Sequence, residues 1–152
     1  FRQGVRGAHD DDVYGRQMVA FASLLDDAGI DNVMAYLATL PDEPLPATVA
    51  GNAAGGKPLY ASTCAACHGK AGEGVWATNA PRLASMSDWY LSTQLKNFKQ
   101  GIRGGHPQDF YGAQMALMAR ILADDRASND LVAYINTLGK PNSQLSAYND
   151  RR

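Results

Sequence analysis

The sequence has no excess of one charge and no long apolar run, and both shortages exclude classes of protein. Its 152 residues carry 14 Lys and Arg against 15 Asp and Glu, a formal charge of −1. Because a nucleic-acid backbone is held by a broad positive field, we expect no nucleic-acid partner. No stretch approaches the roughly 20 consecutive apolar residues of a membrane-spanning helix. The chain begins with Phe1 and has no basic and apolar leader, so we expect any targeting segment to have been removed already or to lie outside this sequence, where any membrane tether would also lie.

Cysteine and histidine are also scarce, since the chain has two cysteines and three histidines. Both cysteines lie in the pentapeptide Cys64-Ala65-Ala66-Cys67-His68. A structural zinc site needs four Cys or His ligands in spaced pairs, and His9 and His106 form no second pair. A thioredoxin-type redox motif follows a buried strand, but residues 55–63 show no strand alternation. Both interpretations are therefore disfavoured.

The remaining interpretation is covalent attachment of haem, for which C-x-x-C-H is the sequence signature. Thiols three positions apart lie on one face of a helical turn, where Cys64 and Cys67 can form thioethers with one porphyrin. The histidine that follows is tethered close enough to the macrocycle to bind its iron. The motif therefore predicts one covalent haem c, with His68 as the proximal ligand.

The second axial ligand should come from the later part of the same unit, where four side chains are candidates: Met86, His106, Met115 and Met118. Met115 lies in an apolar stretch about 50 residues after His68, which gives the chain room to return across the other haem face. We predict Met115 as the ligand and Met118 as core packing. The alternative is that Met115 does not bind, which leaves an open iron face for peroxide or a diatomic gas.

The sequence contains an internal repeat that is incomplete. Residues 1–18 and 98–115 are identical at 11 of 18 aligned positions, and residues 34–40 parallel 132–138. We therefore predict the C-terminal half of a first unit at 1–40, a linker at 41–56, a complete unit at 57–139 and a polar tail at 140–152. We expect an upstream segment that contains the missing half of the first unit and carries a haem of its own. The alternative is that the first unit is a haemless interaction module.

The apolar pattern predicts helices and no strand, so the fold class is all-α. A first helix contains Pro58 in its first turn and leads to Cys64. A second begins after Ser87, with Leu91, Leu95 and Phe98 on one face. Two more are expected over about 112–122 and 129–138.

With these motifs in place, residues 57–139 resemble a class I cytochrome c domain, and the tandem arrangement is similar to two-haem cytochromes of the c4 type. The supporting features are C-x-x-C-H-G at Cys64–Gly69, Pro81-Arg82-Leu83 and an M-x-x-M segment before the last helix. The resemblance implies that Met115 is the axial methionine and that the Pro81 carbonyl accepts the Nδ1 hydrogen of His68.

The resemblance also implies a function and a location. It indicates an electron carrier that cycles between Fe(II) and Fe(III), with a quinol-oxidising complex and a terminal oxidase as redox partners. The alternative is a haem domain of a larger oxidase or dehydrogenase. Because haem is joined to such motifs outside the cytoplasm, we expect the chain in a periplasm or at the membrane surface facing it.

One loop remains open to two interpretations. Arg103 and His106 lie in a glycine-rich segment that repeats Arg6 and His9. Arg103 at the haem edge would pair with a propionate, which makes it a candidate cofactor-binding residue. Alternatively, the glycines only satisfy the backbone of a turn and His106 is solvated.

Overall fold

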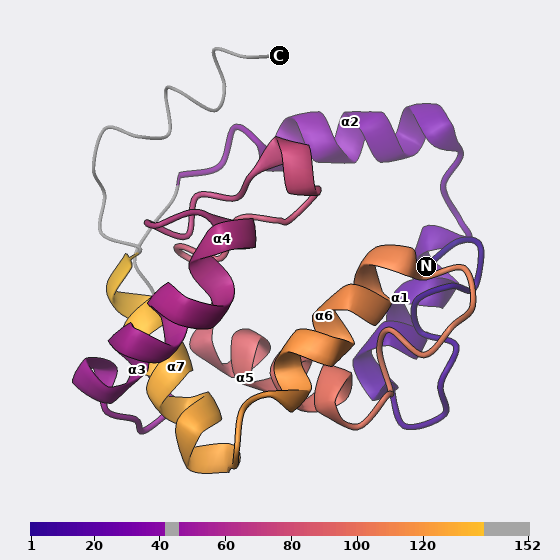
Figure 1. Ribbon diagram of the computed structural model, residues 1–152. Helices are drawn as coiled ribbons and strands as arrows, with labels where there is room; N and C mark the ends of the chain where they lie inside the picture. Colours follow the sequence, from indigo (N-terminus) through magenta and orange to yellow (C-terminus); the bar gives the residue numbers. More distant parts are fainter. Residues whose placement is uncertain (42–45, 139–152) are drawn as a thin grey trace. The chain divides into compact units, whose positions relative to one another are not determined.

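The computed structural model describes residues 1–41 and 46–138, and this part of the chain is helical (Figure 1). The only extended pairing in these ranges is an isolated antiparallel bridge between Val75 and Ala80. The predicted all-α class is confirmed. The polar tail predicted at 140–152 lies outside the described residues.

The chain divides into two packing units. One comprises residues 1–41 and 94–121, and the other comprises residues 42–93 and 122–152. The first packing unit therefore contains the half repeat together with part of the later segment that repeats it. The unit predicted from the sequence at 57–139 contributes residues to both packing units.

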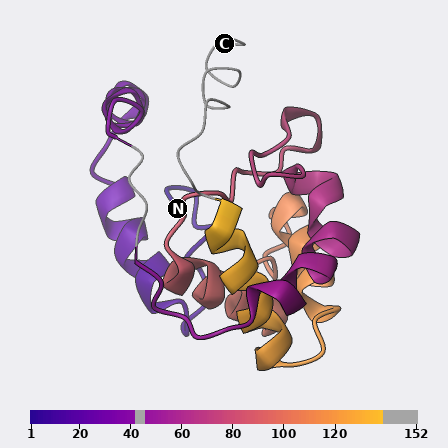
Figure 2. The same ribbon diagram turned by 90° about the vertical axis from the view of Figure 1, so that its left-hand side faces the viewer.

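The second unit is organised around the crossing of α3 (Ala53–Leu59) and α7 (Asp125–Leu138), which lie side by side in both views (Figures 1 and 2). The two backbones touch where Gly56 meets Asp130, because a Cβ on Gly56 would overlap the Asp130 carbonyl oxygen. Only glycine permits this approach. The crossing buries the apolar stripe of α7 at Leu131, Val132 and Ile135.

The start of α3 differs from the sequence prediction. Asn52 caps the helix, since its side chain accepts hydrogen bonds from the N–H groups of Ala54 and Gly55. Pro58 thus lies near the end of α3 and not in its first turn, and the last four residues of the predicted linker are helical. An Ala-Ala-Gly-Gly run has weak intrinsic helix preference, but packing against α7 outweighs that preference.

The chain continues from α3 through a π-helical turn, η1 (Tyr60–Cys64), into α4 (Ala65–His68). A single 3₁₀ turn, η2 (Trp76–Thr78), follows in the loop beyond α4. The helix predicted after Ser87 is α5 (Asp88–Lys99), whose Leu91 is buried as expected.

A buried carboxylate ties the segment before α3 to the start of α5. Asp88 is 3% exposed and accepts hydrogen bonds from the N–H and hydroxyl groups of Thr48, at 2.5 and 2.7 Å, and from the N–H of Val49 at 2.7 Å. Burial alone would raise the pKa of this carboxyl, but the hydrogen bonds outweigh burial and lower it.

The first unit contains α1 (Val13–Ala22), α2 (Asp27–Leu37) and α6 (Phe110–Arg120). Its repeated segments adopt the same local structure. Asp12 accepts a hydrogen bond from Gly15 N–H at the start of α1, and Asp109 does the same for Gly112 N–H at the start of α6. Before each cap a glycine with positive φ, Gly7 or Gly104, lies against the following helix. The sequence repeat is therefore also a structural repeat.

The Asp88 cluster gives a prediction for stability. We expect Asp88→Asn to lower the free energy of unfolding by about 2 kcal/mol at neutral pH, because it weakens charge-assisted hydrogen bonds. Since the folded pKa is depressed, the advantage of the wild-type chain is present above the unfolded pKa of about 4 and is lost as pH falls through the lower folded value.

Chemical denaturation of both proteins between pH 7 and pH 3 measures this difference. The exposed Asp125, in the first turn of α7, provides the matched control, and Asp125→Asn should leave stability nearly unchanged. A difference for Asp88→Asn that stays constant down to pH 3 would contradict the assigned role.

Candidate haem site

The attachment motif lies on η1 and α4 of the second unit. Cys64 ends η1 and is half-buried, whereas Cys67 lies on α4 and is exposed; neither is in a disulfide. Burial, and then the nearby Cys67, raise the pKa of the Cys64 thiol to about 11. Cys64 therefore remains a protonated thiol at neutral pH.

His68 is held in one orientation. It is 7% exposed, and its Nδ1 lies 2.8 Å from the carbonyl oxygen of Pro81. A carbonyl only accepts, so Nδ1 carries the hydrogen and Nε2 keeps its lone pair. Burial lowers the pKa of His68, and the Pro81 hydrogen bond offsets part of that shift. The ring is thus neutral and presents Nε2, the form in which imidazole binds iron.

The loop after His68 places Pro81 at this distance. Gly74 N–H donates to the His68 carbonyl at 2.8 Å, and the N–H groups of Leu83 and Ala84 both donate to the carbonyl of Gly72, at 2.8 and 3.0 Å. A Cβ on Gly74 would lie 2.7 Å from the backbone nitrogen of Arg82, so the loop closes tightly there. These hydrogen bonds bring Pro81 back to the imidazole of His68.

Tyr60 fixes the other side of the motif. Its hydroxyl donates to the Gly69 carbonyl at 2.6 Å, and its ring packs against Tyr134 of α7 with centroids 5.5 Å apart. The side chain is 1% exposed. Burial, followed by the charges of Cys64 and Glu73, raises the phenol pKa, so the hydroxyl stays a donor. Tyr60 therefore joins the start of η1 to the residue after His68.

These residues fit a covalently attached haem. The two thiols are unpaired and three positions apart, and the histidine after them is neutral with Nε2 carrying the lone pair. In the described ranges, no three His, Cys, Asp or Glu side chains gather as a metal site of their own. The donor set is that of a thioether-linked porphyrin with an imidazole ligand, and not that of a zinc centre.

The other predicted site residues, Met115 and Arg103, belong to the first unit. Met115 and Met118 lie on α6 and are both half-buried, so exposure does not distinguish the two thioethers. Arg103 lies over the Phe98 ring, 4.5 Å from its centroid, and Arg6 lies over Phe1 at 4.6 Å.

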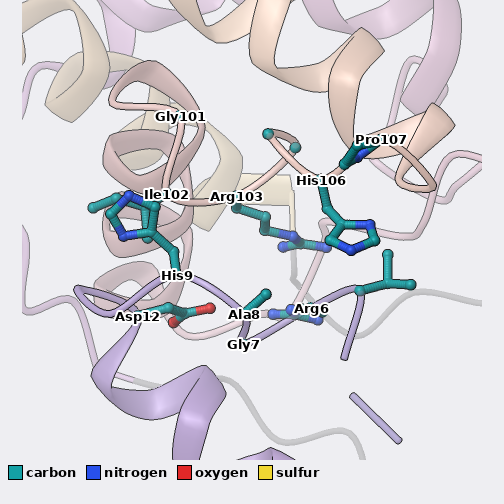
Figure 3. A pocket seen from close by; sticks show the side chains of 13 residues that line it. Arg6, Gly7, Ala8, His9, Asp12, Gly101, Ile102, Arg103, His106 and Pro107 are labelled. Carbon is teal, nitrogen blue, oxygen red and sulfur yellow. The ribbon is translucent and has the colours of Figure 1, made fainter. Parts of the chain in front are cut away.

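The two repeated loops enclose a pocket of about 240 Å³. Arg103 and Arg6 both donate to Gln94 Oε1, at 2.8 and 3.3 Å. Figure 3 shows the two guanidinium groups and the His106 ring close together in this pocket, with His9 and Asp12 at its other end. His106 accepts a hydrogen bond from Gln108 N–H, as His9 does from Asp11 N–H.

Comparison with known proteins identifies the family of this chain. Residues 53–139, more than half of the chain, match the Cytochrome c family. The chain therefore belongs to the cytochrome c family and is of class I, the helical electron-transfer proteins that carry a covalent haem c. The structure describes no helix of sufficient length and apolar character to cross a membrane.

Three relatives show the breadth of this family. The thiosulfate dehydrogenase electron acceptor of Stutzerimonas stutzeri (strain A1501) is 35% identical over 118 residues, which are 71% of this chain and 52% of that protein. Cytochrome c4 of Azotobacter vinelandii is 35% identical over 105 residues, covering 65% and 49%.

The cbb3-type cytochrome c oxidase subunit FixP of Rhizobium etli (strain ATCC 51251 / DSM 11541 / JCM 21823 / NBRC 15573 / CFN 42) is 29% identical over 136 residues, covering 90% and 44%. The chain thus spans about half the length of each of these relatives.

Sequence reasoning missed the Tyr60 hydroxyl, whose hydrogen bond leads to a prediction. Tyr60→Phe retains the ring but leaves the Gly69 carbonyl buried without this donor. We expect a loss of about 1 to 2 kcal/mol in the free energy of unfolding, measured by chemical denaturation of the haem-loaded protein. Tyr111→Phe, at a ring that is 53% exposed, is the matched control. If the two variants were equally stable, the hydrogen bond from Tyr60 to the Gly69 carbonyl would not stabilise the fold.

Proposed function

We propose that this chain is an electron carrier whose haem iron is bound by His68 and Met115. The observation that carries the proposal is the 2.8 Å approach of His68 Nδ1 to the Pro81 carbonyl, which fixes the neutral imidazole. When bound, haem c supplies an Fe(II)/Fe(III) couple. The protein attaches it through Cys64 and Cys67, and the Pro81 carbonyl tunes the electron-donating power of the imidazole.

The assignment of Met115 rests on chain topology and chemistry. It lies 47 residues beyond His68, on α6, and is half-buried, so it has the length of intervening chain that a return to the haem requires. Thioether ligation favours Fe(II) and raises the potential relative to two histidines. If His68 and Met115 both bind the iron, no coordination position would remain for a substrate, which favours electron transfer over peroxide or gas chemistry.

Arg103 is the proposed partner of a haem propionate. Its guanidinium is already oriented by Gln94 and by the Phe98 ring, so less side-chain entropy is lost when it forms an ion pair. Arg6 occupies the equivalent place in the half repeat. It would serve a second haem in the same way if a first unit of the c4 kind precedes residue 1 in the whole protein.

The proposed partners are redox proteins of a respiratory chain. One relative is named as the electron acceptor of a dehydrogenase and another as a subunit of an oxidase. Their names support an electron donor such as a quinol-oxidising complex or a dehydrogenase, and a terminal oxidase as the acceptor. The match to this chain covers only 44% of FixP, which supports the second candidate function, a haem domain within a larger oxidoreductase. For either, the proposed location is the periplasm or its membrane surface.

The two methionines on α6 allow a matched test of the ligand. We expect Met115→Ala to abolish the weak near-infrared sulfur-to-iron band of the oxidised protein and to produce a high-spin spectrum. Met118→Ala should keep the band, because its side chain only fills space. The absorption spectra of both variants, with intact masses to verify one covalent haem each, measure the outcome. A band that survives in Met115→Ala would exclude this residue as the ligand.

A further inference from the structure

Trp76 is the most exposed large apolar side chain that the structure describes. It is 85% exposed and lies on η2, in the loop that follows the attachment motif. A tryptophan side chain offers a large apolar area for burial, and tryptophan is enriched among the residues that carry most of the energy of protein interfaces. Trp76 is therefore a candidate anchor for a protein partner.

Backbone hydrogen bonds hold the loop around Trp76 in one shape. Val75 and Ala80 pair as an antiparallel bridge, with N···O distances of 3.1 and 3.3 Å. Between them, the Asn79 N–H donates to the Trp76 carbonyl at 2.9 Å. Asn79 has a φ of 52°, a left-handed conformation that asparagine adopts more readily than most residues. The indole is thus presented on a hydrogen-bonded loop, so little backbone entropy is lost when a partner binds it.

A side-chain hydrogen bond joins this loop to the haem attachment motif. Thr78 Oγ1 donates to the Cys67 carbonyl at 2.9 Å, and it also lies 3.0 Å from the Val75 carbonyl. Cys67 is itself exposed. Because a thioether at Cys67 would join the porphyrin directly, a protein that docks beside Cys67 would lie close to the haem. The loop therefore places Trp76 next to a point where electrons could enter and leave.

The surface around Trp76 is uncharged. Residues 58–67 and 74–81 contain no Asp, Glu, Lys or Arg. Lys70 and Glu73, which are exposed in the segment between them, have opposite charges. This surface therefore has no field of one sign to steer a charged partner. Its exposed residues, where the two segments meet, form what we call the Trp76 face: Ala66, Cys67, Trp76, Ala77 and Thr78.

We propose that the Trp76 face is the docking surface for a redox protein whose own contact surface is also uncharged, with Trp76 as the anchor. The inference rests on the proposed electron-carrier function and adds the chemistry of the partner. Burial of the indole supplies the affinity, and the small side chains around it allow a close approach to Cys67. Because neither surface is charged, salt has little effect on the rate at which the two proteins meet.

A second copy of the haem-loaded chain is the probe, because it presents an uncharged face of this kind by construction. In a mixture of reduced and oxidised protein, one electron passes from Fe(II) in one copy to Fe(III) in another, and nuclear magnetic resonance measures the rate of this self-exchange. We expect the rate to change by less than about twofold between ionic strengths of about 0.01 and 1 M, although the Debye length falls from roughly 30 to 3 Å. Electrostatically steered docking would change it by about tenfold or more.

Trp76→Glu tests the anchor. It removes the indole and places a carboxylate on the face of both copies, so we expect self-exchange to slow by about tenfold at low ionic strength and to recover in part at high ionic strength. Ala123→Glu is the matched control, because it adds the same charge at an exposed residue of the loop before α7. Its rate should stay within about twofold of that of the unchanged chain. Trp76→Phe, which keeps an aromatic ring, should retain most of the rate.

The two glutamate variants should also keep the melting temperature and the near-infrared band, since Trp76 and Ala123 are both exposed. A slower exchange with an intact band then reports docking and not damage to the haem site. The salt dependence of the unchanged chain needs no variant, so the proposal stays testable if Trp76→Glu does not fold.

Equal self-exchange rates in Trp76→Glu and Ala123→Glu would overturn the docking surface, as would a strong salt dependence in the unchanged chain. A stable dimer in sedimentation that Trp76→Glu dissociates would also overturn it, because the occupant would then be a permanent second copy. So would binding to phosphatidylcholine vesicles that requires Trp76, because the occupant would then be lipid. Absence of self-exchange or of the near-infrared band in the unchanged chain would instead contradict the proposed carrier function itself, so the two failures are distinguishable.

Discussion

The hydrogen bond between His68 Nδ1 and the Pro81 carbonyl is the interaction on which the site depends. An imidazole binds iron only through a nitrogen that has a lone pair, and this bond determines which nitrogen that is. The bond also fixes the plane of the ring before any ligand is present. A loop of 12 residues separates the two groups in sequence, so its hydrogen bonds to Gly72 and His68 serve the chemistry as directly as the ligand itself does.

The crossing of α3 and α7 supports the segment that holds His68. Gly56 brings the two backbones together, and Tyr60, one turn further along, reaches both α7 and the residue that follows His68. Packing and site geometry are therefore produced by one short segment. In the half repeat, α2 is the counterpart of α7 and has no buried residue, whereas α7 is buried at Leu131, Val132 and Ile135.

Part of this could be predicted from the sequence, for identifiable reasons. Cys64 and His68 are adjacent in a short motif whose spacing reflects the chemistry directly, and the apolar stripe of α7 has a clear helical period. The first turns of α3 could not be predicted, because Ala-Ala-Gly-Gly resembles a linker unless the partner backbone is known. The Tyr60 hydrogen bond to Gly69 also leaves no local signal, since it depends on how η1 turns. The predicted roles of Met115 and Arg103 remain predictions.

The π-helical turn has a consequence for how this segment tolerates change. In η1 each turn contains about one residue more than in an α-helix, so this segment holds an extra residue just before the motif. A single deletion between Tyr60 and Cys64 would let the turn close to α-helical geometry, in which four residues advance around the helix axis by about the same angle as five in a π-helix. The cysteines would then keep their direction although the segment before them was shorter. The π-helical turn is therefore a place where the chain can lose a residue without turning the motif, and no sequence signature records it.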